Sequence, residues 1–502
     1  MNRYLIILPI LYLIPFSAIQ AQEEGSEDDY SDYSYLWGED EKKKKEKKKK
    51  EKNNEADSTS SKEPKERVEI DDFRAPLTPE SQGGSFTGGF TYTEIGDEAF
   101  VGMVLSPEFK FGKVGVGLNV PILYGLDDKS IRTEIFKDGV GPARLIRYVR
   151  YGIQKRDPLY VKVGQLDGTM IGYGGLVNNY SNSTSFEKRK VGLHFDTNWK
   201  GFVGLEGMYS DFDPASLNLL VARPYVRPMA FTGIPIVRTF EIGATFVTDK
   251  DQTSFSTSDS TSSSYAFTSQ GVSAFGVDAG FTVLKVPFIQ IDLFATYSKL
   301  IIENDSLQAL STVLLGDDSF KAGSGMSFGT NFRFHFIANV LSTDIRIERL
   351  IYQDHYFPQF FDAVYELNKD AKLLTLINAE KKNGTYASLT GHILQKVKLG
   401  GSVMVPDYYS SDEPATVRLF ADMERLANKF SFHGSYIKGN LDWFGDAFKL
   451  DERSLAKLRF IYHVNRFLAT GVDYYYAFTQ VEDGSYQATK TVMPYVGVSI
   501  DF

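Results

Sequence analysis

The chain has 502 residues, with 55 lysines and arginines against 64 aspartates and glutamates, a formal net charge of −9 and 0 cysteines. This acidic balance argues against a nucleic-acid partner, which would require a basic face. The lack of cysteine excludes disulfides, cysteine-ligated metals and thiol catalysis.

The first element, residues 1–21, is predicted to be a secretory signal peptide. Arg3 precedes the apolar run Tyr4–Ile19, and the small residue Ala21 stands where cleavage is expected. A membrane anchor is the alternative, but the run is shorter than the ~20 residues that a helix needs to cross a bilayer. A lipid anchor of the lipoprotein type would need a cysteine, so the sequence predicts secretion.

Residues 22–79 are predicted to be a disordered, charged arm. The run Lys42–Lys50 is interrupted only by Glu46, and the whole segment holds few apolar residues with which to offset its ordering entropy. A solvated helix is the alternative for the lysine run, although like charges four residues apart oppose it. An even-stranded barrel would place this arm in the periplasm, where the lysine run could touch an anionic cell-wall or leaflet surface.

Residues 80–502 are predicted to be all-β, because turn signals such as Asn383-Gly384 separate segments of strand length. From Gly325 to Phe336 the even positions hold methionine, phenylalanine and threonine, while the odd ones are small, polar or charged. Such a segment matches the ~9–11 residues of a tilted membrane-crossing strand. Helical patterns are scarce: one covers 363–382 and a weaker one covers 417–429.

The alternating pattern continues for more than the ~250 residues that a soluble all-β domain commonly reaches. In a bilayer every backbone group must be paired within the protein, so strands can cross only as a closed barrel. We therefore predict a transmembrane, antiparallel, up-and-down β-barrel of about 18 strands, within a range of roughly 16 to 20. Long, polar, solvent-facing loops are expected at 131–144, 178–188, 249–269, 304–321 and 353–382.

The last strand, Tyr495 to Phe502, carries Tyr495, Gly497, Ile500 and Phe502 at positions that resemble the C-terminal β-signal of bacterial outer-membrane proteins. The resemblance covers eight residues. It implies that the barrel-assembly machinery reads this strand, that the strand closes the sheet against the first one, and that the barrel lies in outer-membrane lipid. The size is similar to that of a porin, with no closer family.

The inward faces of the predicted strands carry charges of both signs, and we expect a lumen lined by Lys162, His194, Lys200, Asp292, Arg333, His335, Asp344, Arg346, Glu348 and Arg459. The loop 353–382 is expected to fold into this lumen, because Tyr356, Phe357, Phe360 and Phe361 are too apolar for a solvated loop.

These features predict a porin-like channel for passive diffusion of small hydrophilic solutes. The alternative is a structural or adhesive surface protein with a closed barrel, whose long loops, such as the Ser/Thr-rich 249–269, bind external ligands. A transporter of hydrophobic substrates is the third hypothesis, which the inward charges oppose. Solute identity, lumen opening and oligomeric state stay open.

We expect no enzyme activity, no cofactor and no metal. The Gly-x-Ser-x-Gly pattern at 325–329 lies within a strand, whereas a hydrolase nucleophile needs a strand-to-helix turn. The 6 histidines are scattered and show no zinc-ligand spacing. A serine or acid that meets a histidine only in space, as in a phospholipase or protease, cannot be recognised at this level.

Overall fold

The computed structural model describes residues 72–76, 83–95, 98–133, 140–183, 189–213, 217–250, 254–258, 264–268, 271–302, 320–336, 340–394, 396–408, 415–441, 444–451, 454–480 and 486–501. The chain divides into two compact units, 1–66 and 67–502. The first unit, which holds the predicted signal peptide and most of the predicted arm, lies outside the described residues, so both assignments stay predictions.

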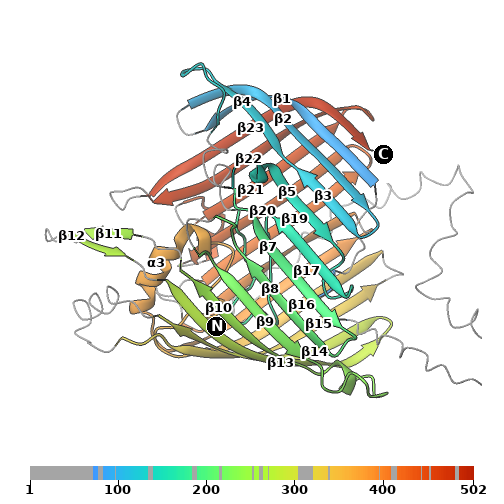
Figure 1. Cartoon of the computed structure of the whole chain (residues 1–502), viewed down its shortest axis with the longest axis vertical. Coiled ribbons are helices and arrows are strands. Elements are labelled where there is room, and N and C mark those ends of the chain that lie inside the picture. Colours follow the sequence, from blue (N-terminus) through green and yellow to red (C-terminus); the bar gives the residue numbers. More distant parts are fainter. Residues whose placement is uncertain are drawn as a thin grey trace, which may run out of the picture. The chain divides into compact units, whose positions relative to one another are not determined.

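The second unit is one closed antiparallel sheet (Figure 1). Its 21 strands are β1 (Gly83–Ile95), β2 (Glu98–Phe111), β3 (Val114–Leu118), β4 (Val120–Gly125), β5 (Ile146–Tyr151), β6 (Leu159–Gly164), β7 (Gly192–Trp199), β8 (Val203–Tyr209), β9 (Leu220–Val226), β10 (Glu241–Asp249), β13 (Val272–Val286), β14 (Ile289–Ile301), β15 (Ser324–Phe336), β16 (Leu341–Tyr352), β17 (Lys382–Ile393), β18 (Val397–Pro406), β19 (Ala415–Leu426), β20 (Phe430–Leu441), β21 (Ser454–His463), β22 (Leu468–Gln480) and β23 (Tyr486–Asp501).

The predicted all-β barrel is confirmed, but about 18 strands was too low a number. Since β3 and β4 both pair with β2 and share one place in the sheet, the barrel has 20 strand positions. The first and last strands pair from Ser85–Asp501 to Ile95–Thr491, which closes the sheet. The prediction assumed about ten residues per strand, whereas β5 to β9 have only 6 to 8 residues each, so more strands fit.

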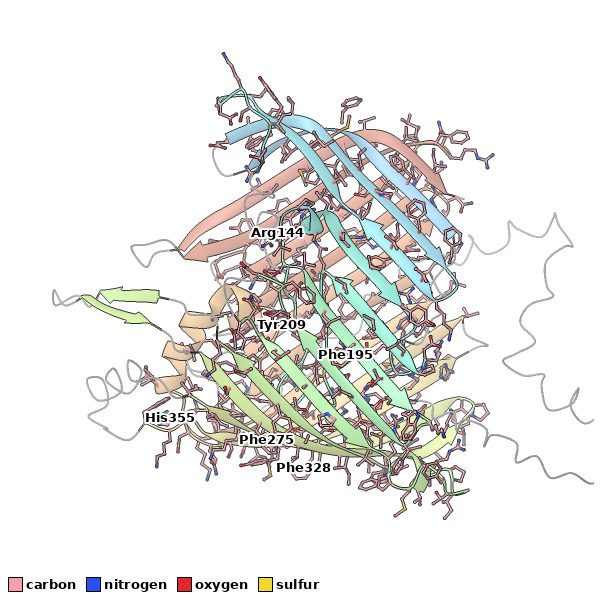
Figure 2. All side chains as sticks on the ribbon, in the orientation of Figure 1. Arg144, Phe195, Tyr209, Phe275, Phe328 and His355 are labelled. Atoms are coloured by element: carbon pink, nitrogen blue, oxygen red, sulfur yellow. The ribbon has the colours of Figure 1, made fainter. Side chains whose placement is uncertain are left out.

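The outer face of the sheet is apolar, as the alternating pattern predicts. On β15, Phe328 is 54% exposed on the outer surface, while its neighbours Ser327 and Gly329 are buried toward the inside (Figure 2). The rings of Phe332, Phe334 and Phe336 stack along the same outer face. Outward apolar side chains on a closed sheet are what hydrocarbon requires.

The weaker helical pattern at 417–429 was wrong, because these residues form most of β19. Their backbone groups pair with β18 on one side and β20 on the other. A closed ladder needs a strand at this place, and this requirement outweighs a chance helical periodicity. Among the described residues, no helix is long and apolar enough to span a membrane.

The two ends of the barrel differ. We call the end where β1 begins and β23 ends the terminal end, and the other the distal end. All five predicted long loops belong to connections at the distal end, as the strand order requires. They include α3 (Tyr365–Ile377), which confirms the helical pattern at 363–382, and a hairpin of β11 (Ser254–Ser258) and β12 (Ser264–Thr268), both on the left in Figure 1. The described residues also contain three short 3-10 helices: Gly141–Leu145, Val237–Thr239 and Phe444–Phe448.

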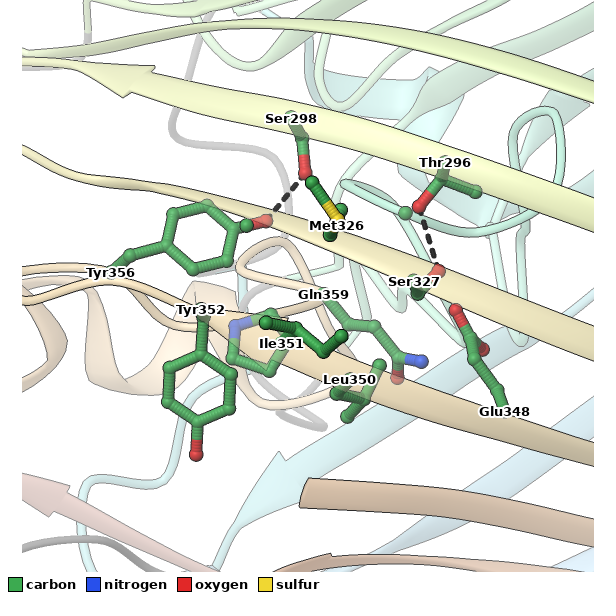
Figure 3. Close-up of a pocket in the computed structure, with 13 residues that line it drawn as sticks. Thr296, Ser298, Met326, Ser327, Glu348, Leu350, Ile351, Tyr352, Tyr356 and Gln359 are labelled. Atoms are coloured by element: carbon green, nitrogen blue, oxygen red, sulfur yellow. Dashed lines mark hydrogen bonds between the residues drawn. The ribbon is translucent and has the colours of Figure 1, made fainter. Parts of the chain in front are cut away.

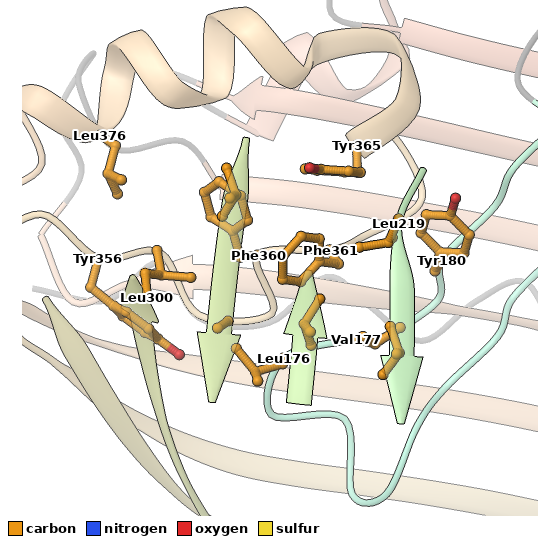
Figure 4. Packing of buried hydrophobic residues seen from close by; sticks show 14 of the residues in the cluster. Leu176, Val177, Tyr180, Leu219, Leu300, Tyr356, Phe360, Phe361, Tyr365 and Leu376 are labelled. Carbon is orange, nitrogen blue, oxygen red and sulfur yellow. The ribbon is translucent and has the colours of Figure 1, made fainter. Parts of the chain in front are cut away.

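The largest apolar core lies inside the barrel, between the wall and two connections that fold inward. Phe360 and Phe361 are fully buried, and Phe361 forms a bridge with Val177 of the other connection (Figure 4). The expected inward folding of 353–382 is therefore confirmed. The solvent-facing position expected for 178–188 was wrong for its described part, because Tyr180 and the polar residues around it are buried.

Candidate functional site: the lumen

Two loops cross the lumen near the distal end. Residues 165–183, which follow β6, reach the far wall, where Arg418 of β19 donates to the Asn179 amide oxygen and Lys457 of β21 donates to the Ser183 carbonyl. We call this segment the crossing loop. Its polar side chains can be buried because they have partners: Asn182 donates to the Ser210 carbonyl at 2.8 Å.

The second loop carries α3 and also reaches both sides of the barrel. At the start of α3, Tyr365 donates to Asp249 of β10 at 2.9 Å, and Lys369 pairs with the same carboxylate at 2.8 Å. Ala363 packs instead against apolar residues of β20, β21 and β22, including Ile437. Burial raises the pKa of Glu366 in α3, but Lys190 and Lys369 lower it more strongly, so its pKa lies below the usual range.

The inner wall has a covered part and an open part. Along β13 to β16, inward side chains such as Asp292 and Ser298 are buried under the two loops. Along β18 to β20, inward side chains such as Ser402 and Asp422 are half-buried, and Lys398 is exposed. We call β18 to β20 the open wall, because these inward side chains are in contact with solvent.

A buried ion network occupies the covered side of the lumen. Arg223 of β9 is completely buried and donates to Asp278 of β13 and to Glu241 of β10, the latter at 2.8 Å. Lys155 lies 2.9 Å from Glu206, which is itself 3.4 Å from Arg223. Buried charges persist only when they are paired in this way, so the network links β8, β9, β10 and β13 and stabilises their register.

A short N-terminal segment, residues 72–76, completes this network from inside the barrel. The sequence predicts that these residues belong to the disordered arm, yet the Arg74 guanidinium makes hydrogen bonds of 3.0 and 2.9 Å to Glu241. It also stacks over the Tyr173 ring of the crossing loop at 4.5 Å. Arg333 of β15 donates to the backbone carbonyls of Phe73 and Ala75 at 2.6 and 3.1 Å. We call these residues the lumen segment.

Asp72 fixes the lumen segment electrostatically. Its carboxylate accepts from Arg74 at 2.6 Å and from Arg227 at 3.0 Å. Burial alone would raise the pKa of Asp72, but Arg74 and Arg227 outweigh it and lower the pKa to about 2. Asp72 is therefore ionised at any neutral or mildly acidic pH.

Nine of the ten residues predicted to line the lumen lie on strands, and five of these nine take part in three ion pairs. Arg333 pairs with Asp344, Arg346 with Glu348, and Arg459 with Asp473, each with a contact of 2.8 Å or less. The others on strands are Lys162, His194, Asp292 and His335. Lys200 differs: it is exposed in the turn after β7, beside Trp199. Because β7 ends at Trp199, residue 200 lies outside the strand, and the alternation of inward and outward side chains does not apply to it.

These predicted residues do not form one ring. Arg333, which pairs with Asp344, holds the lumen segment, whereas Arg346 donates to the Tyr173 carbonyl of the crossing loop at 2.5 Å. Lys162 and His194 are register partners on β6 and β7, and Arg459 lies on β21. Whether any of them lines a conducting path stays a prediction.

Sequence reasoning missed the Arg223 network. Its members come from strands far apart in the chain, and Arg223 stands in a strand with the otherwise mostly apolar sequence LVARPYV. A charged residue inside a predicted strand is the only available signal. It shows an inward-facing position, but the partner depends on strand register, which the sequence does not state.

The Gly-x-Ser-x-Gly pattern has a structural explanation. Ser327 and Thr296 share a hydrogen bond of 2.8 Å at a small pocket between the wall and the α3 loop (Figure 3). Any Cβ atom at Gly325 would overlap the Tyr356 ring, whose hydroxyl meets Ser298 at 2.5 Å. The glycine therefore makes room for the loop, and the motif serves packing. Among the described residues, no group of three or more acidic or histidine side chains is placed to hold a metal ion.

The predicted assembly signal lies at the closing seam of the barrel. Tyr495, Gly497 and Ile500 pair with Thr91, Gly89 and Phe86 of β1. The pairing of last and first strands that the resemblance implies is confirmed, while Phe502 lies outside the described residues.

A closed antiparallel sheet with an apolar outer face and a charged interior defines a transmembrane β-barrel of the outer-membrane type. No protein-family model matches the chain, and no relative was found among curated proteins. Solved structures of outer-membrane barrels share the architecture only distantly. OccAB4 of Acinetobacter baumannii is 9% identical, with 85% of this chain and 99% of that chain covered and a TM-score of 0.31.

Two further structures give similar values. OccK2 of Pseudomonas aeruginosa, solved in complex with glucuronate, is 11% identical over 83% of this chain and 96% of its own, with a TM-score of 0.29. Wzi of Escherichia coli, described as a carbohydrate-binding β-barrel involved in capsule assembly, is 10% identical over 84% and 85%, with a TM-score of 0.31. Likeness at this level identifies no family and no solute for this chain.

Proposed function

We propose that the protein is a porin-like channel of the bacterial outer membrane, through which small hydrophilic solutes diffuse passively. The single observation that carries the proposal is the open wall. Inward side chains of β18 to β20, such as Ser402, Asp422 and Lys398, are polar or charged and in contact with solvent. A barrel that served only as a rigid support would fill this space with packed side chains.

The path runs between the open wall and the crossing loop. On the other side of that loop, the apolar core around Phe361 and the ion network around Arg223 leave little room for solute. Because the crossing loop reaches β19 and β21 through Arg418 and Lys457, it narrows the path at that height. A narrowing lined by polar groups would select solutes by size and charge.

In the proposed orientation the terminal end faces the periplasm. With 20 strand positions both ends of the barrel chain emerge on one side, and the connections at the other side are the long ones. Long external and short periplasmic connections are typical of outer-membrane barrels. The predicted arm would then begin in the periplasm.

Single-channel recording of the refolded protein in a planar bilayer tests the proposal. Stable current steps from a folded barrel are the expected result, with folding checked by heat-modifiable migration in SDS gels. A folded barrel that never conducts would overturn the channel and favour the adhesive alternative, which protease shaving of intact cells would then test through loss of surface binding.

A further inference from the structure

Cations gather where the crossing loop meets the far wall. Lys457 of β21 lies 3.8 Å from Asp167 of the crossing loop. Arg418 of β19 reaches the same loop, with its Nη2 atom against Gly168. Lys162 of β6 lies on the strand from which the loop departs. We call Lys162, Arg418, Lys457 and Asp167 the basic station.

The charge balance of the basic station differs from that of the ion network on the covered side. In the network, four cations (Arg74, Lys155, Arg223 and Arg227) meet five carboxylates (Asp72, Asp196, Glu206, Glu241 and Asp278), which leaves a net −1. At the basic station three cations meet one carboxylate, which leaves a net +2. The excess positive charge therefore lies on the side of the proposed path.

The station is accessible from the lumen. The Asp167 side chain is 56% exposed and that of Lys457 is 21% exposed. Arg418 uses one terminal nitrogen for Asn179, while its Nε atom, which is buried behind the accessible part of the station, makes no hydrogen bond to any described protein group. A donor without a protein acceptor is costly unless water or a ligand oxygen meets it.

We propose that the basic station binds small oxyanions, solutes that carry a carboxylate or phosphate group, on their way through the channel. This inference rests on the proposed channel function. Oxygen atoms of such a group are the acceptors that a guanidinium and two ammonium groups recognise, and attraction between charges is stronger inside a protein than in water.

Asp167 keeps this binding weak enough for release. Enclosure in the barrel raises the pKa of Asp167, but the positive charges of Lys457, Lys162 and Arg418 lower this pKa by more than burial raises it. The carboxylate therefore stays ionised. A passing anion thus meets a net charge of +2 instead of +3. Conduction requires that a site attract its solute and also let it leave.

The test is the reversal potential of the refolded channel under a KCl gradient. We expect a preference for chloride over potassium, which falls about twofold in Lys457→Gln and in Lys162→Gln and rises about twofold in Asp167→Asn. Lys457→Arg keeps the charge and should keep the preference. Lys396→Gln, at an exposed turn of the terminal end, removes the same charge outside the lumen and should change nothing.

A second measurement identifies the solute class. Inorganic phosphate and acetate, added separately, should each reduce the chloride current of the wild type, and both effects should weaken in Lys457→Gln. A channel that conducts but prefers potassium, or whose preference ignores these substitutions, would overturn the basic station and leave the channel intact. A folded barrel without any current would overturn the channel itself, so the two failures are distinguishable.

Discussion

The guanidinium of Arg74 and the carboxylate of Glu241 are joined by two hydrogen bonds, of 3.0 and 2.9 Å, although 167 residues separate them in the chain. Arg74 belongs to the lumen segment and Glu241 to the wall of the barrel. The pair therefore ties the N-terminal part of the second unit to the interior of the sheet. In the proposed channel, release of the lumen segment would open space on the covered side of the lumen, beside the proposed path, so its attachment bears on conductance.

Replacement of Arg74 by alanine should release the lumen segment. Glu241 would keep Arg223 at 2.8 Å and Arg227 at 2.7 Å, so we expect the barrel to stay folded while the segment loses about 1–3 kcal/mol of docking energy. The measurable result is a larger and noisier single-channel current. Arg466→Ala, which removes an arginine from an exposed turn, is the matched control. Identical currents in the two variants would show that the segment does not obstruct the path.

Acid should release the same segment through Asp72. Its pKa in the folded protein, about 2, lies below its ordinary value of 3.8, so ionised Asp72 stabilises the docked segment above pH ~4. This contribution, about 2 kcal/mol, is lost as the pH falls from about 4 toward 2. Conductance recorded between pH 7 and 2 should rise within that window.

Asp72→Asn separates this effect from other acid titrations. Without the carboxylate, the variant should show the larger current already at pH 7 and should not gain more below pH 4. If the wild type and Asp72→Asn respond to acid in the same way, the transition arises from another group.

The fold was predictable because each strand carries its own information. In β15 the alternation of Phe328 with Ser327 and Gly329 predicts both a strand and which of its faces points outward. In a bilayer such strands must form a closed barrel. The inward α3 loop was predictable from Phe360 and Phe361, which no solvated loop would expose.

The interior was predictable only in part, because it depends on pairs between distant residues. Asn182 has the polarity of a solvated loop and is buried only because Ser210 and Leu166 offer it partners. The sequence around Arg223 does not predict that Asp278 is its partner, because strand register decides which inward residues meet. Arg74 follows a highly charged segment, so composition alone places Arg74 in the predicted disordered arm, although it is docked inside the barrel.

The α3 loop should depend on Phe361. This ring is fully buried between the loop, Val177 and Tyr365, so Phe361→Ala should cost about 3–5 kcal/mol of loop docking. We expect flickering current and faster proteolysis of the loop, with the barrel itself intact in SDS gels. Phe328→Ala removes the same ring from the outer face, where lipid replaces the lost contact, and serves as the control. Equal protease sensitivity of both variants would contradict the assigned packing.

The closing seam should be sensitive to a single methyl group at Gly497. A Cβ atom there would overlap the backbone of Gly88 and Gly89 in β1, neither of which can move without breaking the ladder that joins β1 to β23. Gly391 of β17 offers a matched control, because a Cβ atom at that glycine meets only the Leu399 carbonyl, at 3.8 Å. We therefore expect Gly497→Ala to lower the yield of heat-modifiable, folded barrel several-fold on refolding into lipid, and Gly391→Ala to leave it unchanged. A normal yield from Gly497→Ala, with amide exchange in β1 and β23 as slow as in the wild type, would show that the seam adapts and that strand closure does not depend on this close approach.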